Sequence, residues 1–310
     1  MPPAQPNQPL PQGFRLDQYV IESKISQGGF SIVYLAHDAA GAAFAIKEYL
    51  PVGIAQRFGE TAAPVVPSEN KAAFNQGMKA FFEEGRLLAR IDHPNVVHVL
   101  NFFRANDTAY MVMPYETGRS LQEHMRSVHD ANEPVSEDFL RDVFVRLLSG
   151  LREVHTQKLL HLDIKPANIF LKRDGQPILL DFGATRLGLG EASSVLMAVH
   201  TREFAAPEQA GSGEPLGPWT DIYAVGATLY ACIAGKPPMA AADRMQDDQL
   251  QSAQQAWHRR YSPQLLELID WCLMLRTESR PRSVFALQKV LGGDLLDLVD
   301  PSWFTTPRPV

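Results

Sequence analysis

The chain has little cysteine and no long apolar run, and both features limit the classes of protein to which it can belong. Only two of its 310 residues are cysteines, Cys232 and Cys272, which lie far apart within apolar stretches. This spacing argues against a disulfide framework or a cysteine metal site, and it predicts buried, reduced thiols in a cytoplasmic protein. The longest apolar run, residues 222–235, is too short for a membrane span and predicts a buried helix. We therefore expect no membrane segment in this chain.

The chain also lacks the clusters of positive charge that are typical of nucleic-acid-binding proteins and of secretory signals. The net charge is −6, and no long basic block interrupts the mixture of both signs, so nucleic acid is not an expected partner. The first positively charged side chain is Arg15, which argues against a secretory signal at the start of the chain. What is present is an ordinary apolar fraction of 45%, enough to bury a core in one large domain or two modest ones.

The pattern of residue types changes along the chain. Residues 1–13 are rich in proline and glutamine and nearly uncharged, which predicts a disordered tail. Residues 14–115 alternate short β-rich stretches with one long helical pattern, whereas helical patterns dominate residues 116–298. The chain is therefore expected to be α+β. Residues 299–310 are expected to be a tail or a linker.

Helical periodicity is clearest in four segments. Residues 71–91 and 136–155 each carry one apolar face, and Ser136 is suited to cap the second helix at its N-terminus. Two further amphipathic helices are expected at residues 265–275 and 284–291. The simplest interpretation of all four apolar faces is core packing.

The residues that indicate a chemical function lie between His161 and Gly183. The sequence there reads His-Leu-Asp-Ile-Lys-Pro-Ala-Asn up to Asn168, and Asp-Phe-Gly from Asp181. Two short strand patterns separated by Asp-Gly predict a hairpin that brings Asn168 and Asp181 side by side. An amide oxygen and a carboxylate placed together suit Mg²⁺. Asp163 is left to face an incoming hydroxyl, and Lys165 supplies a positive charge for a transferring phosphoryl group.

This string resembles the catalytic loop and metal-binding motif of the eukaryotic-type protein kinases. The resemblance implies a two-lobed α+β fold, with a small β-rich N-lobe at residues 14–115 that contains one key helix, and a larger, mainly helical C-lobe at residues 116–298. It also implies roles for four residues. Asp163 would orient the substrate hydroxyl and accept its proton, Lys165 would stabilise the phosphoryl group, and Asn168 and Asp181 would hold Mg²⁺.

A second set of residues resembles the ATP site of that family. Strand patterns at residues 20–24 and 32–36 flank a turn containing Gly28 and Gly29, and glycines there let backbone amides approach phosphate. Ser26 and Ser31 stand where the family usually has its first and third glycines. The resemblance implies that ATP is bound through the following residues: Ile25, Ser26, Gly28, Gly29, Val33, Ala45, Lys47, Glu84, Met113 and Tyr115.

Four of these residues have specific implied roles. Lys47 would position the α and β phosphates, and we expect Glu84, rather than the neighbouring Glu83, to hold it through an ion pair. Met113 would be the gatekeeper and Tyr115 a hinge residue. Gly85 weakens its own helix by up to ~1 kcal/mol.

Further likenesses to the family cover most of the chain. Thr201 and residues 204–209 resemble the end of an activation segment, and Arg280 resembles the arginine that pairs with the glutamate of the Ala-Pro-Glu motif, here Glu208. These features imply a platform that accepts a peptide, and Lys165 implies Ser or Thr as the acceptor. Leu162 replaces the arginine that binds a phosphorylated loop residue in many members, so we expect activity without that phosphorylation.

One stretch has no counterpart in these motifs. The connection at residues 51–70 is interpreted as a tolerated surface insertion, with a regulatory or docking role as the alternative. Just before it, the run Lys-Glu-Tyr-Leu-Pro starting at Lys47 is similar to bacterial members of the family.

The sequence thus predicts a bacterial Ser/Thr protein kinase that uses ATP and Mg²⁺ on protein substrates. The alternative is a pseudokinase that acts as a nucleotide-binding scaffold or signalling adaptor, which the two serines of the glycine-rich turn would favour. The physiological substrate, the upstream signal, the oligomeric state and any further domains stay open.

Overall fold

The computed structural model describes residues 7–59, 61–131, 133–182, 201–210 and 213–293. These residues fall into two compact units. The first comprises the described parts of Met1–Gly118 and Leu180–His200, and the second those of Arg119–Leu179 and Thr201–Val310. The lobe limits expected from the sequence, 14–115 and 116–298, stay a proposal.

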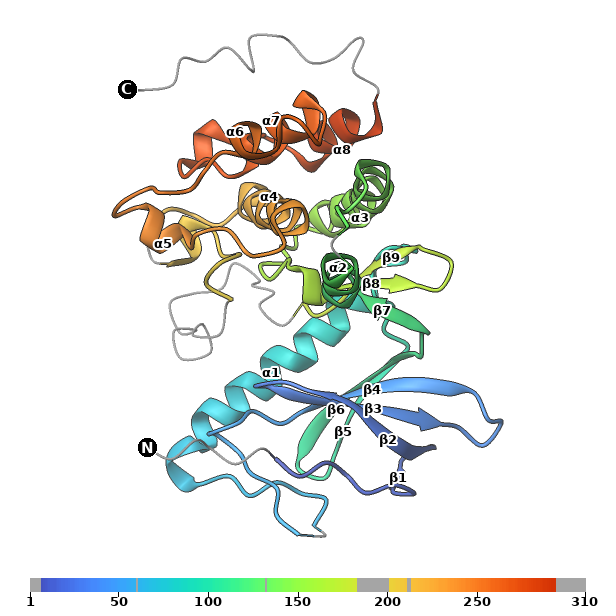
Figure 1. The fold of residues 1–310 in the computed structure, drawn as a ribbon. Helices are drawn as coiled ribbons and strands as arrows, with labels where there is room; N and C mark the ends of the chain where they lie inside the picture. The colour runs from blue at the N-terminus through green and yellow to red at the C-terminus, as the bar shows by residue number, and fades with distance from the viewer. Residues whose placement is uncertain (1–6, 60, 132, 183–200, 211–212, 294–310) are drawn as a thin grey trace. The chain divides into compact units, whose positions relative to one another are not determined.

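A six-stranded antiparallel sheet forms the base of the first unit (Figure 1). The order across the sheet is β1-β2-β3-β4-β6-β5. The strands are β1 (Arg15–Leu16), β2 (Tyr19–Gln27), β3 (Ser31–His37), β4 (Ala43–Tyr49), β5 (Asn101–Ala105) and β6 (Thr108–Pro114). The strands predicted at residues 20–24 and 32–36 are present as β2 and β3, and both extend beyond the predicted limits, whereas β1 and β5 were not predicted.

Helix α1 (Lys71–Leu88) packs against β5 and β6 of this sheet, and a short 3-10 helix, η1 (Ser68–Asn70), precedes it. Aromatic contacts fix the helix, since the Tyr49 ring lies 5.3 Å from that of Phe74 and 5.8 Å from that of Phe81. The helix runs unbroken through Gly85. A Cβ there would lie 3.2 Å from Cε of Met111, so glycine permits the close approach of helix and sheet.

One expectation for the first unit was wrong, and another was incomplete. Residues 7–13 are not a disordered tail, because Asn7 and Leu10 are each only 3% exposed and the Asn7 side chain donates to the carbonyls of Leu50 and Ala55. The connection at residues 51–70 is not merely a surface insertion, because it delivers Arg57, 2% exposed, into the interior. Both segments are anchored by polar contacts that no local pattern signals. Residues 1–6 lie outside the described residues.

The second unit is mainly helical. Its small sheet has the order β7-β8-β9, with β7 (Gly118–Ser120), β8 (Ile169–Lys172) and β9 (Pro177–Leu179). The antiparallel β8–β9 hairpin confirms the one predicted. The helices are α2 (Leu121–Asp130), α3 (Glu137–Thr156), α4 (Pro218–Ala234), α5 (Ala241–Arg244), α6 (Ala253–Trp257), α7 (Pro263–Cys272) and α8 (Val284–Gly292). Three 3-10 helices, η2 (Pro166–Asn168), η4 (Pro207–Ala210) and η5 (Thr277–Ser279), complete the unit.

Helix α4 is the buried centre of this unit, as its apolar sequence predicts, and it packs against α7 while α3 packs against α8 (Figure 1). A Cβ on Gly226 of α4 would overlap that of Cys272 on α7, so the glycine allows the two helices to touch. Cys232 and Cys272 are free and buried, as expected. Ser136 caps α3 through the Phe139 amide at 3.2 Å. Within the described part of the chain, every helix is too short or too polar to cross a bilayer.

Candidate active site

In the second unit, Asp163 and Lys165 form a compact cluster with Thr201. The Lys165 ammonium donates to both carboxylate oxygens of Asp163, at 2.8 and 3.1 Å, and to the Thr201 hydroxyl at 2.9 Å. All three side chains belong to segments that the sequence singled out. The contact between Lys165 and Thr201 joins the catalytic loop to the segment that resembles a peptide platform.

Asn168 fixes the orientation of Asp163 from the other side. Its side-chain amide donates to the Asp163 carboxylate at 2.8 Å and to the Asp163 carbonyl at 2.9 Å. It can do so because η2 starts with Pro166 and turns the chain between the loop and β8. Because the amide nitrogen makes these bonds, the side-chain oxygen is the atom of Asn168 suited to a hard cation.

A fully buried carboxylate supports the catalytic loop. Asp221, in the first turn of α4, accepts the backbone amides of His161 at 3.0 Å and Leu162 at 2.8 Å, and Nε2 of His155 lies 2.7 Å from it. Burial alone would raise the pKa of Asp221, but the hydrogen bond from His155 and the charges and amide around it hold the pKa below its ordinary value. The carboxylate therefore stays ionised and ties the central helix to the loop.

The backbone of Leu162, an uncharged residue, is held by hydrogen bonds to two polar side chains. Its φ of 64° is unusual for a side chain that is not glycine, and its carbonyl accepts the Gln209 side chain at 2.8 Å while its amide binds Asp221. These two hydrogen bonds therefore hold the strained backbone conformation of the residue directly before Asp163.

In the first unit, Lys47 lies between two carboxylates. Its ammonium is 2.7 Å from Asp181 and 3.8 Å from Glu84, so the expected pair with Glu84 is present and Asp181 is the nearer partner. Glu83 instead pairs with Arg86 at the surface. Burial raises the pKa of Glu84, the charge of Lys47 opposes this rise, and Asp181 adds to it.

The predicted nucleotide residues of adjacent strands lie together in this unit. In the β3–β4 and β4–β6 registers, Val33 is opposite Lys47 and Ala45 is opposite Met113. The Tyr115 amide donates to the Ala43 carbonyl at 3.3 Å, so the amide of this predicted hinge residue already has a partner.

The glycine-rich turn leaves room for a ligand at its backbone. No atom lies within 4 Å of the position that a Cβ would take at Gly28 or Gly29. Ser26 is paired with Val33 in β2–β3, beside an irregularity in the register, and Ile25 is exposed. These glycines fit the approach of a phosphate group to the main chain.

The site residues thus divide between the units. Asp163, Lys165 and Asn168 belong to the second, whereas Lys47 and Asp181 belong to the first. That Asn168 and Asp181 share one metal ion stays a prediction, and Gly183 lies outside the described residues.

The expected buried ion pair of the second unit is present. Arg280 and Glu208 make two bonds, at 2.7 and 3.0 Å, and both side chains are fully buried. Thr220 donates to the same carboxylate at 2.8 Å, and the Arg280 guanidinium lies 4.9 Å from the centre of the Tyr223 ring. The pair therefore joins η4 to the segment after η5.

Sequence reasoning missed three supporting residues. His155 and Gln209 support the catalytic loop through contacts that no spacing in the sequence reveals. Arg57 was overlooked because it stands in a polar, proline-punctuated connection. One available signal was Glu48, which with Lys47 is one of two charged residues in β4, since an acid demands a partner when it is buried.

Comparison with solved structures gives a close match. The apo form of PpkA-294 superposes with a TM-score of 0.80 at 35% identity, covering 91% of this chain and 99% of that one. The kinase domain of PknI from Mycobacterium tuberculosis, as a C20A_R136A double mutant, shares the fold with a TM-score of 0.69 at 20% identity, over 92% and 99% of the two chains.

Two curated relatives match over shorter parts of their own length. Sperm motility kinase 2B of Mus musculus is 32% identical over 73% of this chain and 41% of its own, and serine/threonine-protein kinase PkaA of Streptomyces coelicolor is 28% identical over 85% and 48%. The chain thus spans less than half the length of both. The protein kinase domain family matches residues 19–291. With this match and the geometry above, the chain belongs to the protein kinase domain family.

Proposed function

We propose that this domain transfers the γ-phosphoryl group of ATP to serine and threonine hydroxyls of proteins, with Mg²⁺ as the metal ion. The observation that carries the proposal is the arrangement of Asp163, which Lys165 and Asn168 hold while Lys165 also binds Thr201. A carboxylate fixed in this way can orient one hydroxyl, accept its proton and keep a cation beside the transferred group.

Lys47, Glu84 and Asp181 of the first unit and Asn168 of the second are the residues proposed to bind the nucleotide and its metal ion. Lys47, steadied by Glu84, is the cation for the α and β phosphates. Asp181 and Asn168 offer a carboxylate and an amide oxygen, which are donors that Mg²⁺ accepts. When bound, the ion neutralises phosphate charge. A cytoplasmic location is part of the proposal and rests on the two buried free thiols.

The acceptor class can be tested directly. The protein is incubated with Mg²⁺ and γ-labelled ATP in the presence of a basic protein that contains serine, threonine and tyrosine, and the labelled amino acids are identified after hydrolysis. We expect phosphoserine and phosphothreonine, and background label with the Asp163→Ala variant. Label mainly on tyrosine would contradict the acceptor class. Label equal to that of the variant would favour the pseudokinase alternative.

A further inference from the structure

The residue that follows Lys47 is a buried acid on the opposite face of the sheet. Side chains alternate along a strand, so Lys47 and Tyr49 face α1 while Glu48 points away from it. Glu48 is fully buried, and both oxygens of its carboxylate accept hydrogen bonds. Tyr34 and Tyr110 each donate to it at 2.7 Å.

Arg57 completes this network from the connection between β4 and α1. Its guanidinium binds both oxygens of Glu48, with Nη1 at 2.9 Å, and also donates to the carbonyls of Ala62 and Gln8. A bidentate pair of this kind fixes distance and angle together. The position of the connection is therefore set relative to the strand that carries Lys47.

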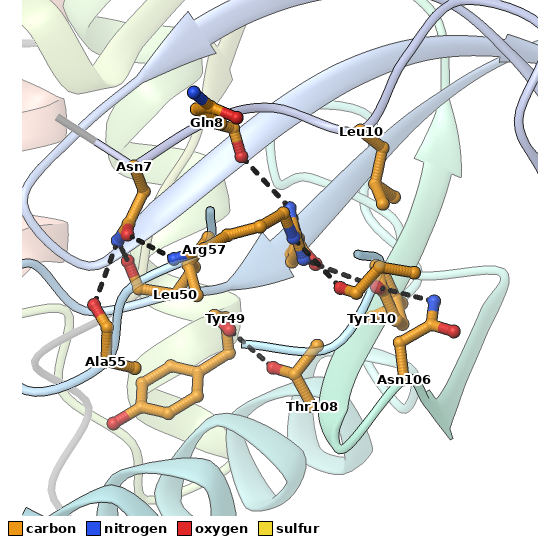
Figure 2. A network of polar contacts seen from close by, with 12 residues as sticks. Asn7, Gln8, Leu10, Tyr49, Leu50, Ala55, Arg57, Asn106, Thr108 and Tyr110 are labelled. Atoms are coloured by element: carbon orange, nitrogen blue, oxygen red, sulfur yellow. Dashed lines mark hydrogen bonds and ion pairs between the residues drawn. The ribbon is translucent and has the colours of Figure 1, made fainter. Parts of the chain in front are cut away.

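Residues 7–10, here called the N-terminal strap, close the network from outside. The Asn7 side chain accepts the Arg57 amide at 3.0 Å and donates to the carbonyls of Leu50 and Ala55 at 3.3 and 3.2 Å (Figure 2). The Leu10 amide donates to the Tyr34 hydroxyl at 3.1 Å. One asparagine thus holds both ends of residues 50–57.

The same elements hold the glycine-rich turn. The amides of Leu50 and Val52 each donate at 2.8 Å, to the carbonyls of Phe30 and Gly29. Gln27, the last residue of β2, donates its side-chain amide to the Asn7 carbonyl at 2.9 Å. The turn is therefore tied to the connection on one side and to the strap on the other.

We propose that Asn7 and Arg57 are positioning residues for nucleotide binding, which hold the glycine-rich turn and the strand of Lys47 in the arrangement that receives phosphate. This inference rests on the proposed use of ATP. It assigns a role in the phosphotransfer site to the residues before β1 and to the connection between β4 and α1. Neither segment contains a residue that was predicted to bind the nucleotide.

The test compares Asn7→Ala with Gln8→Ala in the full chain. Gln8 is exposed and contributes only its carbonyl, so it is a matched control within the strap. Asn7→Ala is expected to raise the KM for ATP and the Kd of ATP about fivefold to tenfold, the scale of one or two hydrogen bonds, with kcat changed less than about twofold. Without nucleotide, amide hydrogen exchange in residues 25–33 should become faster in Asn7→Ala but not in Gln8→Ala. Arg57→Lys, which loses the bidentate geometry, should change KM and exchange in the same direction.

Each outcome decides the proposal. Values of KM and exchange equal to those of Gln8→Ala would overturn it, as would a fall in kcat alone that follows a lower melting temperature. If exchange in residues 25–33 rises but no variant binds ATP, the positioning role stands and the proposed function fails.

Discussion

At the scale of single residues, Asp221 shows how a buried charge serves the catalytic loop. Its carboxylate accepts two consecutive backbone amides and faces His155, and all of these groups lie in the second unit. Because the native contacts favour the ionised form, the pKa of this group is lower in the folded protein than its ordinary value of 3.8. The stabilisation is then present above about pH 3.8 and is lost as the pH falls through the lower, folded pKa.

Asp221→Asn is therefore expected to lower the free energy of unfolding at pH 7, and the difference from the parent protein should shrink as the pH falls below 4. The shrinkage should be at most roughly 1.4 kcal/mol for each pH unit. Urea unfolding at a series of pH values measures it. The control is Asp142→Asn, which removes a surface pair with Arg146 and should change stability by less than about 0.5 kcal/mol. A difference that stays constant with pH would show that the ionised form of Asp221 is not favoured.

Sequence predicted roles for Asp163, Lys165 and Asn168 through their resemblance to the protein kinase motif, and the structure brings these three side chains together. The same resemblance favoured Glu84 over Glu83 as the partner of Lys47, and the structure places the first at Lys47 and the second at Arg86. It could not find Asn7, whose side-chain partners lie 43 to 50 positions away, or Arg57, whose buried partner Glu48 lies on β4. A polar partnership at that separation depends on the tertiary fold and leaves no local pattern.

At the scale of elements, the Glu208–Arg280 pair joins η4 to the chain after η5. Removing one partner leaves the other charge buried without compensation, which costs about 3–5 kcal/mol. Glu208→Ala should therefore lower the free energy of unfolding by this amount, measured by urea denaturation. The comparison variant is Glu278→Ala, which removes an exposed pair with Arg276 and should cost less than about 1 kcal/mol. Equal effects of the two variants would show that burial does not strengthen the requirement for the pair.

Elements with strong periodicity were predicted well, and weakly patterned ones were not. Helix α3 begins and ends within one residue of the expected limits, because its cap and apolar face agree. Helix α1 ends at Leu88, three residues before the predicted end, since the chain turns there. Helix α2 was missed: it has few apolar positions, and the capping box of Ser120 and Glu123 defines its start.

At the scale of the whole molecule, the catalytic loop is set without a basic residue before Asp163. Leu162 supplies only its amide and carbonyl, which bind Asp221 and Gln209. A phosphate on the activation segment would lack the arginine that commonly binds it. Thr185, Ser193 and Ser194, the candidate sites in that segment, lie outside the described residues.

We therefore expect the fully dephosphorylated protein to act on a peptide at its full initial rate. Progress curves for phosphatase-treated protein should show no lag, and a triple variant with alanine at Thr185, Ser193 and Ser194 should match the parent within about twofold. Thr201 is left unchanged because it binds Lys165. A lag that preincubation with ATP removes in the parent, but not in the triple variant, would refute this expectation.

The central claim is that this domain is a catalyst whose key residue is Asp163. The most direct measurement is the initial rate of phosphoryl transfer from Mg²⁺-ATP to a serine peptide at saturating substrate, for the parent and for Asp163→Asn. Losing the proton acceptor should lower kcat about 100-fold or more, while the Kd of ATP and the melting temperature stay close to those of the parent. A rate for Asp163→Asn within a few-fold of the parent, or no transfer above background by the parent itself, would contradict the account.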